Sequence, residues 1–425
     1  MHNQLPLPSV SLIDAALAYI DAYWSKIIRH NPEDRQTLIG LPHPYLVPGH
    51  GEMFQEMYYW DSYFMSLGLL DTEYEDMIVG MTHNLAHLFR RFGLIPNGSR
   101  YYFLSRSQPP FFTRMIKLAF DVFKKSDENQ ALSFLKEMIL LAEAEQENVW
   151  LGREQPHHRL MEFGLSRYFD INFLDMLASC ESGWDHSTRC EDRWMHHLPV
   201  DLNSILYARE IDLSEVFALL GDTERSESWK ERAEERAETM REKMWREGCG
   251  YFFDYDLEKQ CNDTNPSLAG FFPLWAGLAT VEQAERMVES WLPRFEHDGG
   301  LVTTLDQQAG RQWAFPNGWA PLQWLVVEGL DRYGYSQDAN RIRAKWITNC
   351  ATIFDRTGAM WEKYNVVTPE LVPEGGLYGS VAGFGWSNAV FVDFVRKLSG
   401  HVAMPAEEAV SLQAGISRSQ SIELT

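Results

Sequence analysis

Long apolar runs are missing from this sequence, in which no stretch approaches the roughly 18 apolar residues of a membrane-spanning helix. The first 22 residues also lack a basic region followed by an apolar run and a cleavage site. Cysteine is rare: five residues are widely scattered, with no C-x-x-C or Cys/His spacing. We therefore expect reduced, mostly buried thiols, a cytoplasmic location, no membrane partner, no metal ion and no cofactor.

Basic residues are few as well. The chain has 38 Lys and Arg against 60 Asp and Glu, which gives a formal net charge of −22. Nucleic acids and anionic membrane surfaces require a basic patch, so neither is an expected partner. The acidity suits a protein that acts on a small neutral ligand. The composition gives no sign of a large assembly, and we expect a monomer or a weak homo-oligomer.

Strand-like segments are scarce, with 251–255 as the main example, whereas helical periodicity recurs almost from end to end. A length of 425 residues would by itself suggest two or three domains. The unbroken helical pattern instead favours one all-α catalytic domain over 1–402, followed by a tail over 403–425. Helices are expected at 13–28, 59–70, 73–92, 111–124, 127–147, 169–178, 201–220, 224–246, 267–278, 281–291, 320–333, 336–354 and 388–398.

Five loops share one composition, in which Trp, Tyr and Phe stand beside Asp, Glu, Asn, Gln and Arg. Aromatic rings stack on the C–H faces of a sugar, while planar polar side chains bind its hydroxyl groups. Any one of these aromatic residues is well explained as part of a large core, but the recurrence favours a sugar-binding site. The loops are 54–64, 96–110, 181–189, 312–324 and 361–365, the last of which leads into 375–388.

Hydrolysis of a glycosidic bond needs a protonated acid and an ionised base or nucleophile. Asp185 follows a glycine and a tryptophan, a setting that can desolvate its carboxyl group and raise the pKa. Asp185 could equally cap a helix and pair with Arg189 at i+4. Glu362 precedes Lys363, which could keep the carboxylate ionised, or the two could form a simple exposed pair. Asp185 is the candidate acid and Glu362 the candidate base.

The chain resembles the trehalase family, glycoside hydrolase family 37, over about residues 48–390. The first family signature, Phe-x-Glu-x-Tyr-x-Trp-Asp-Ser-Tyr, is matched at 54–63. The second, Gln-Trp-Asp-x-Pro-Asn-Gly-Trp-Ala-Pro, is matched at 312–321, except that Ala314 replaces the aspartate. Further matches are Pro96–Tyr102, Arg106–Pro110, Glu181–Asp185, Val200–Asn203, Glu362–Tyr364 and Gly383–Trp386.

This resemblance implies an (α/α)6 barrel with long active-site loops and an inverting mechanism. Asp185 would protonate the glycosidic oxygen, and Glu362 would activate a water molecule on the opposite face of the sugar. The two carboxyl groups would then lie roughly 6.5–9.5 Å apart. The motif residues expected to bind the substrate are Phe54, Tyr59, Trp60, Asp61, Asn97, Arg106, Gln108, Gly183, Trp184, Arg189, Gln312, Trp313, Asn317, Trp319, Tyr378 and Trp386.

Four departures from the family pattern concern charged groups that grip the sugar. Met53 replaces an arginine, Ala314 an aspartate, and Leu377-Tyr378 a Glu-Tyr pair, while an Arg-Pro-Arg-Pro-Glu-Ser loop before the acid is missing. Each buried polar group left unpaired costs ~1–3 kcal/mol. We therefore expect the glucose subsite to be kept and the leaving-group subsite to be remodelled. The favoured substrate is a small neutral α-glucoside, 2-O-α-glucosylglycerol, from which glucose would be released.

Three alternatives stay open. The first is an α,α-trehalase that cleaves trehalose to two glucose molecules. The second is a glucosylglycerate or mannosylglycerate hydrolase, for which Arg159 or Arg167 could supply the positive charge that an anionic leaving group needs. The third is a sugar-binding protein without activity, which would have no need of both Asp185 and Glu362.

Overall fold

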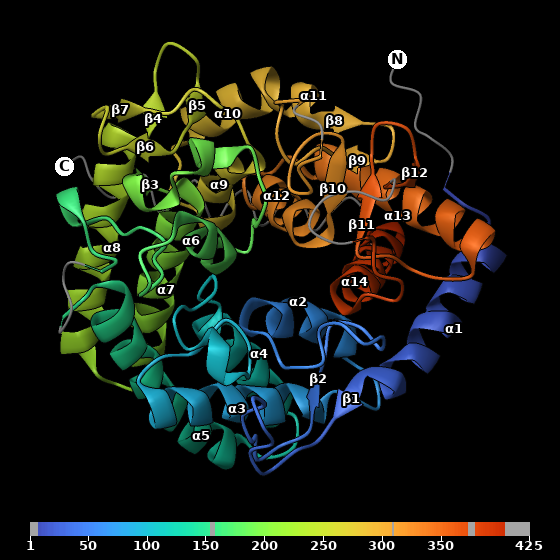
Figure 1. Cartoon of the computed structure of the whole chain (residues 1–425), viewed down its shortest axis with the longest axis horizontal. Coiled ribbons are helices and arrows are strands. Elements are labelled where there is room, and N and C mark those ends of the chain that lie inside the picture. Colours follow the sequence, from blue (N-terminus) through green and yellow to red (C-terminus); the bar gives the residue numbers. More distant parts are fainter. Residues whose placement is uncertain (1–6, 154–157, 308–309, 373–378, 404–425) are drawn as a thin grey trace.

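The computed structural model describes residues 7–153, 158–307, 310–372 and 379–403. The chain runs once around a ring, from α1 to α14, and its first and last helices meet (Figure 1). Within the described residues, an inner ring is formed by α2 (Tyr59–Leu69), α4 (Phe112–Lys124), α7 (Val200–Leu219), α9 (Phe272–Ala276), α12 (Ala320–Arg332) and α14 (Gly385–Ala403). The outer ring is formed by α1 (Val10–Ile27), α3 (Asp76–Phe92), α5 (Glu128–Glu145), α8 (Thr223–Lys243), α10 (Val281–Ser290) and α13 (Ser336–Thr357).

Each inner helix packs against its neighbours in the ring, and α14 closes the ring by packing on both α12 and α2. This arrangement is an (α/α)6 barrel, and it confirms the fold expected from the sequence. The expected domain, 1–402, covers the barrel. The expected tail, 403–425, lies outside the described residues from 404 onward.

The two rings differ in composition because they differ in burial. All eleven residues of α2 are buried, including the polar Asp61 and Ser62. The outer helix α8 buries a single stripe: Trp229, Ala233, Arg236, Ala237 and Met240. A helix that is covered on all sides cannot be amphipathic in the usual sense, so polar residues on the inner ring need partners within the protein.

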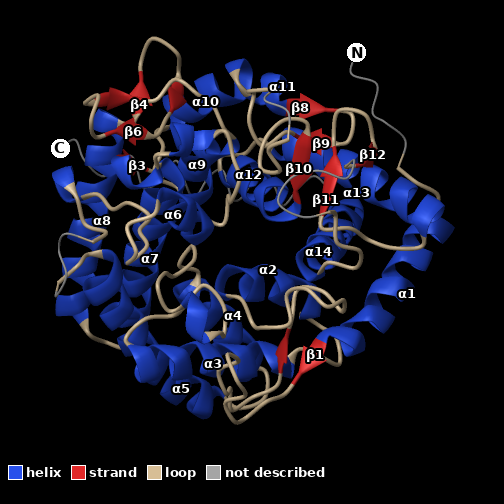
Figure 2. Cartoon of the chain, viewed as in Figure 1, coloured by secondary structure: helices blue, strands red, loops and turns tan. Residues whose placement is uncertain are grey.

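The connections between helices carry short antiparallel strands that the sequence analysis largely missed (Figure 2). The strands are β1 (Ile28–Arg29), β2 (Tyr45–Leu46), β3 (His197–Leu198), β4 (Trp245–Arg246), β5 (Tyr251–Phe252), β6 (Tyr255–Asp256), β7 (Cys261–Asn262), β8 (Glu296–His297), β9 (Gly300–Leu301), β10 (Asn317–Trp319), β11 (Lys363–Asn365) and β12 (Glu370–Leu371). The important pair for the site is β10 with β11, in which Trp319 lies opposite Lys363.

One expected helix was misplaced. The sequence predicts a helix over 169–178, but the structure begins α6 at Asp175 and ends it at Ser182. Of the apolar residues before it, Phe169 is buried, whereas Ile171 and Phe173 lie in a loop and are each 58% exposed. Gly183 ends α6 in the left-handed conformation, with φ +74°, and so places Asp185 just beyond the helix. The small remaining helix is α11 (Leu292–Phe295).

Candidate active site

The predicted sugar-binding loops converge on a cavity of about 150 Å³ at one end of the inner ring. Both candidate catalytic residues line it, although Asp185 follows α6 and Glu362 precedes β11. The cavity is lined by Phe54, Tyr58, Trp60, Asp61, Asn97, Phe103, Arg106, Gln108, Cys180, Gly183, Asp185, Trp313, Glu362, Phe384 and Trp386.

The Asp185 carboxyl group is in the setting of a proton donor. Burial, followed by repulsion from Glu362, raises its pKa to about 6. The side-chain amide of Gln312 donates to Asp185 Oδ2 at 2.8 Å. A carboxyl group with a pKa near neutrality can be protonated in the resting enzyme and give up its proton during the reaction.

The Glu362 carboxyl group is in the opposite setting. It is 1% exposed, and the ammonium group of Lys363, itself fully buried, lies 2.6 Å from Glu362 Oε2. An adjacent positive charge favours the ionised carboxylate. The Glu362 carbonyl accepts from Trp386 Nε1 at 3.2 Å and from Ser387 Oγ at 3.3 Å. Glu362 and Lys363 therefore form a buried pair, not the exposed pair that was the alternative.

A third carboxyl group, Asp61 on α2, lies in the same cavity. Burial, with further contributions from Glu362 and Asp185, raises its pKa to about 8. Its neighbour Gln108 accepts from the backbone N–H of Trp60 at 3.0 Å. The raised pKa favours the neutral form of Asp61, which can both donate to and accept from a sugar hydroxyl group.

Asn97 and Arg106 contribute the other polar side chains of the cavity. Asn97 Nδ2 donates to the carbonyls of Ser107 at 3.1 Å and Cys180 at 2.9 Å, which ties its loop to α6. Arg106 lies 3.5 Å from Asp170, a long ion pair, and its buried Nε has no hydrogen-bond partner among the described residues. The guanidinium group therefore keeps donors for a ligand.

Gly183 is required where it stands. Besides its left-handed φ, a Cβ atom at this position would lie 2.6 Å from Cζ2 of Trp60. The absence of a side chain lets the turn before the acid pack directly on the indole ring that lines the cavity.

Some predicted binding residues lie behind the cavity wall. Tyr59 directs its hydroxyl to Glu145, 3.0 Å away, and Arg209. Arg189 is fully buried, and it pairs with Asp201 at 2.6 Å and Asp254 at 2.7 Å. The alternative pairing of Arg189 with Asp185 is thus absent, since the guanidinium group binds two other carboxylates.

The remaining predicted residues support the wall from behind. Trp184, Asn317 and Trp319 are buried and do not line the cavity. Trp319 stacks on Trp313 with ring centroids 3.8 Å apart. Gln312 does not line the cavity itself but binds Asp185, which does. Tyr378 lies outside the described residues.

Four lining residues were not among the predicted binders: Tyr58, Phe103, Cys180 and Phe384. The aromatic three lie within or beside the predicted sugar-binding loops, so the composition of those loops was the available signal. Nothing in the sequence marks Cys180, whose thiol pKa is raised to about 11 by burial and by the charge of Asp185. The expectation of mostly buried thiols holds for Cys190 and Cys350, whereas Cys249 and Cys261 are exposed.

The two arginines considered for an anionic leaving group have structural partners. Arg159 is buried against Glu181, with Nη2 2.5 Å from Oε1. Arg167 donates to the carbonyls of His158 at 2.9 Å and Met195 at 2.6 Å. Neither side chain lines the cavity.

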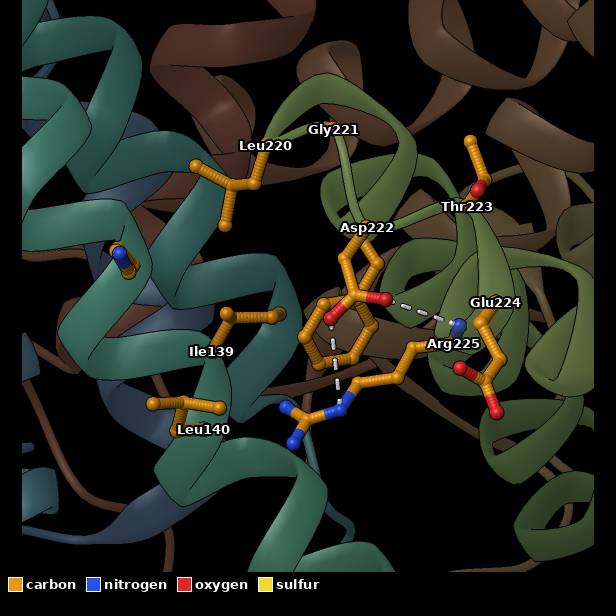
Figure 3. Close-up of a pocket in the computed structure, with 10 residues that line it drawn as sticks. Ile139, Leu140, Leu220, Gly221, Asp222, Thr223, Glu224 and Arg225 are labelled. Atoms are coloured by element: carbon orange, nitrogen blue, oxygen red, sulfur yellow. Dashed lines mark hydrogen bonds and ion pairs between the residues drawn. The ribbon is translucent and has the colours of Figure 1, made fainter.

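A larger hollow, of about 580 Å³, lies between α5 and the turn that joins α7 to α8 (Figure 3). One of its two acidic residues, Asp222, caps α8 by accepting from the backbone N–H of Arg225 at 3.2 Å and also lies 3.6 Å from the Arg225 side chain. Asp222 and Arg225 thus bind each other and stabilise a helix end.

In the described part of the chain, no group of three or more His, Cys, Asp and Glu side chains is arranged to hold a metal ion. Over the same residues, every helix is too short or too polar to cross a bilayer.

Two buried carboxyl groups share an aromatic cavity, one with a raised pKa and one beside a cation, and a pair of carboxyl groups is what hydrolysis of a glycosidic bond requires. A protein-family model named Trehalase matches residues 9–172 and 170–399. The periplasmic trehalase of Xanthomonas campestris pv. campestris (strain B100) is 35% identical over 416 residues, covering 89% of this chain and 72% of that protein. A periplasmic trehalase of Escherichia coli O1:K1 / APEC is 33% identical over 410 residues, covering 88% and 72%.

Solved structures agree with these matches. The neutral trehalase of Saccharomyces cerevisiae superposes with a TM-score of 0.80 at 27% identity, covering 91% of this chain and 94% of that one. A mannosylglycerate hydrolase of Thermus thermophilus, at 21% identity and a TM-score of 0.63, covers 90% and 100% and shares the fold. The chain belongs to the trehalase family, and it is a glycoside hydrolase.

The expectation of a cytoplasmic location is wrong, because the matching curated relatives are periplasmic trehalases. Five scattered cysteines without a pairing pattern are compatible with a reducing or an oxidising compartment. The cysteine content therefore could not decide the location.

Proposed function

We propose that this protein is an inverting α,α-trehalase that cleaves trehalose to two glucose molecules. The observation that carries the proposal is the opposite setting of two carboxyl groups in one cavity: Asp185 has a raised pKa, and Glu362 is paired with a buried ammonium group. Membership of the trehalase family and the names of the relatives support trehalose as the substrate. Those names also support a periplasmic location.

In the proposed reaction, Glu362 takes a proton from a water molecule while the water oxygen bonds to the anomeric carbon. Asp185 gives its proton to the glycosidic oxygen as the bond from that oxygen to the anomeric carbon breaks. One glucose leaves as the protonated leaving group, and the other leaves with inverted configuration. Asp61, Asn97 and Arg106 would bind hydroxyl groups of the ring that is attacked.

A second candidate substrate is 2-O-α-glucosylglycerol, favoured by two features of the site. The cavity of about 150 Å³ is well below the roughly 300–1,000 Å³ of pockets for drug-sized ligands, so its enclosed part suits a single sugar ring. Ala314 is fully buried at a position where the family pattern has an aspartate. Both features suit a leaving group smaller than glucose. Hydrolysis of glucosylglycerate or mannosylglycerate is less supported, because Arg159 and Arg167 have structural partners.

The test is glucose release from trehalose, 2-O-α-glucosylglycerol and glucosylglycerate at equal concentration, with the Asp185→Asn protein as the control. Proton NMR of the first turnovers identifies the released anomers. The proposal expects the highest kcat/KM on trehalose, with one α-glucose and one β-glucose formed per molecule. A higher kcat/KM on glucosylglycerol would establish the second candidate, and binding without any turnover would establish a sugar-binding protein.

A further inference from the structure

The two catalytic carboxyl groups each have a close side-chain partner, and both partners are held by the same small ribbon. We define the β10–β11 ribbon as 317–319 paired with 363–365. Gln312, which donates to Asp185 Oδ2, lies five residues before this ribbon. Lys363, which pairs with Glu362, is the first residue of β11.

Trp319 connects these partners. Its indole Nε1 donates to the backbone carbonyl of Gln312 at 3.0 Å, and Asn317 Nδ2 donates to the same carbonyl at 3.0 Å. Across the ribbon, Trp319 lies opposite Lys363, whose Nζ is 5.2 Å from the centroid of the Trp319 ring. The opposite face is occupied by Trp313, stacked with an interplanar angle of 3°. Trp319 is fully buried and has little freedom to move.

The loop that carries Gln312 is also tied to the loop that carries the acid. The backbone N–H of Trp313 donates to the carbonyl of His186 at 3.3 Å, and Ser187 Oγ donates to the carbonyl of Trp313 at 2.9 Å. Gln312 is therefore fixed at its backbone by the ribbon and at its side chain by Asp185. Such double fixation is expected for a residue that sets the position of a reacting group.

The hydrogen bond from Gln312 also makes the two oxygens of the Asp185 carboxyl group unequal. A neutral carboxyl group has one O–H donor and one oxygen that only accepts. Because the Gln312 amide donates to Oδ2 at 2.8 Å, this bond favours Oδ2 as the accepting oxygen and Oδ1 as the oxygen that carries the proton. The side chain of Gln312 thus orients the carboxyl group and also favours one of its oxygens as the proton donor.

We propose that Gln312 is the positioning residue of the general acid, and that Trp319 fixes Gln312 and Lys363 on one ribbon so that acid and base keep a constant separation. The proposal rests on the proposed roles of Asp185 and Glu362. It assigns no contact between Gln312 and the substrate.

The expected effect on pH dependence has a definite sign. The charged and titratable groups around Asp185 are Asp61, Arg106, Cys180, Glu362 and Lys363. The bond from Gln312 lowers the pKa of Asp185, against the larger effect of burial. Without this bond the pKa rises, so the acid stays protonated to higher pH. The alkaline limb of the kcat profile then moves upward, even though kcat falls because the proton is no longer aimed.

The test uses Gln312→Met, which keeps the length of the side chain but loses its donor. We expect kcat on trehalose to fall about 10- to 100-fold with KM changed less than threefold, and the alkaline limb to move to higher pH. Trp319→Phe keeps a stacking ring but loses the N–H bond to Gln312, and a smaller fall of about 3- to 10-fold is expected. Trp150→Phe is the matched control, because this buried indole N–H has no partner among the described residues.

A purely structural role for Gln312 would lower kcat or the melting temperature and leave the pH limb in place, and this result would overturn the proposal. Wild-type kcat and pH limb in Gln312→Met would overturn it as well. If Gln312→Met does not fold, Gln312→Leu also removes the donor without adding a charge, and the same upward movement of the limb is required. The proposed function fails separately, if Asp185→Asn retains full activity or the wild type hydrolyses none of the three glucosides.

Discussion

Asp185 and Glu362 are the same functional group in the same cavity, yet their surroundings act on them in opposite directions. Asp185 has a neutral amide as its partner, and burial raises its pKa to about 6. Glu362 is as deeply buried but has a cation 2.6 Å from its carboxylate. The comparison shows that burial alone does not assign an acid or a base. Under the proposed mechanism, the charge of the nearest partner decides which carboxyl group is the acid and which is the base.

The largest expected effect separates the two roles directly. Asp185→Asn should lower kcat on trehalose by about 10²–10⁴-fold, because no proton reaches the leaving oxygen. On α-glucosyl fluoride, whose leaving group needs no proton, the same variant should stay within about tenfold of the wild type. Glu362→Gln should lose activity on both substrates, because water is no longer activated. Initial rates of glucose and fluoride release measure this; equal losses of Asp185→Asn on both substrates would contradict its role as the acid.

The next effect concerns the ammonium group of Lys363. Lys363→Met should lower kcat at pH 6 by about tenfold or more and move the acidic limb of the profile to higher pH, because the ionised form of Glu362 loses its neighbouring charge. Lys125→Met is the control, since its Nζ also lies 2.6 Å from a carboxylate, Glu75, but at the surface. The acidic limb of the Lys125→Met profile should stay in place, because exposed ion pairs contribute little interaction energy. An unmoved acidic limb in Lys363→Met would mean that Lys363 has no part in ionising the base.

The next effect is on stability and not on rate. The pKa of Asp61 is raised by burial to about 8, above its ordinary value of 3.8, so protonation stabilises the folded state. This contribution to the free energy of unfolding is complete below about pH 4 and is lost as the pH rises towards 8. Its full size is no more than about 6 kcal/mol. The Asp61→Asn protein should therefore gain melting temperature relative to the wild type between pH 5 and pH 8. A difference that does not vary with pH, as expected for the surface variant Asp14→Asn, would contradict the raised pKa.

The smallest expected effect concerns the reactivity of Cys180, which lines the cavity near Asp185. The Cys180 thiol lines the cavity, and burial and the charge of Asp185 raise its pKa to about 11, so little of it is thiolate at pH 8. Alkylation by iodoacetamide should be at least about tenfold slower at Cys180 than at the exposed Cys249 and Cys261. Peptide mass mapping over time measures the three rates. Equal alkylation rates at the three thiols would contradict the burial of Cys180 and the influence of the Asp185 charge on it.

The fold was predictable from the sequence because helical periodicity and the family motifs both extend over most of the chain. The wrong helix over 169–178 has a physical cause: apolar side chains such as Ile171 and Phe173 are exposed in a loop, where periodicity gives no information. The two candidate catalytic residues, which the structure places in one cavity, were predicted from local signals: a glycine and a tryptophan before Asp185, and a lysine after Glu362.

The supporting contacts were not predictable in the same way. Gln312 meets Asp185 across 127 positions, and Arg189 meets Asp254 across 65. Both were expected to bind the sugar because they stand in motifs rich in sugar-binding residues. A motif indicates that a residue is needed near the site, but only the packing shows whether its side chain faces the cavity or supports its wall.

Closure of the ring by α14 on α2 has a consequence for how the enzyme matures. The two helices are more than 300 positions apart, yet α2 carries Asp61 and α14 carries Trp386, and both residues line the cavity. A ribosome has to translate almost the whole described chain before the last wall of this cavity exists. Contacts of such long sequence separation also form late and slowly in folding. Hydrolysis can therefore begin only after the barrel has closed, and the appearance of activity reports the final step of folding.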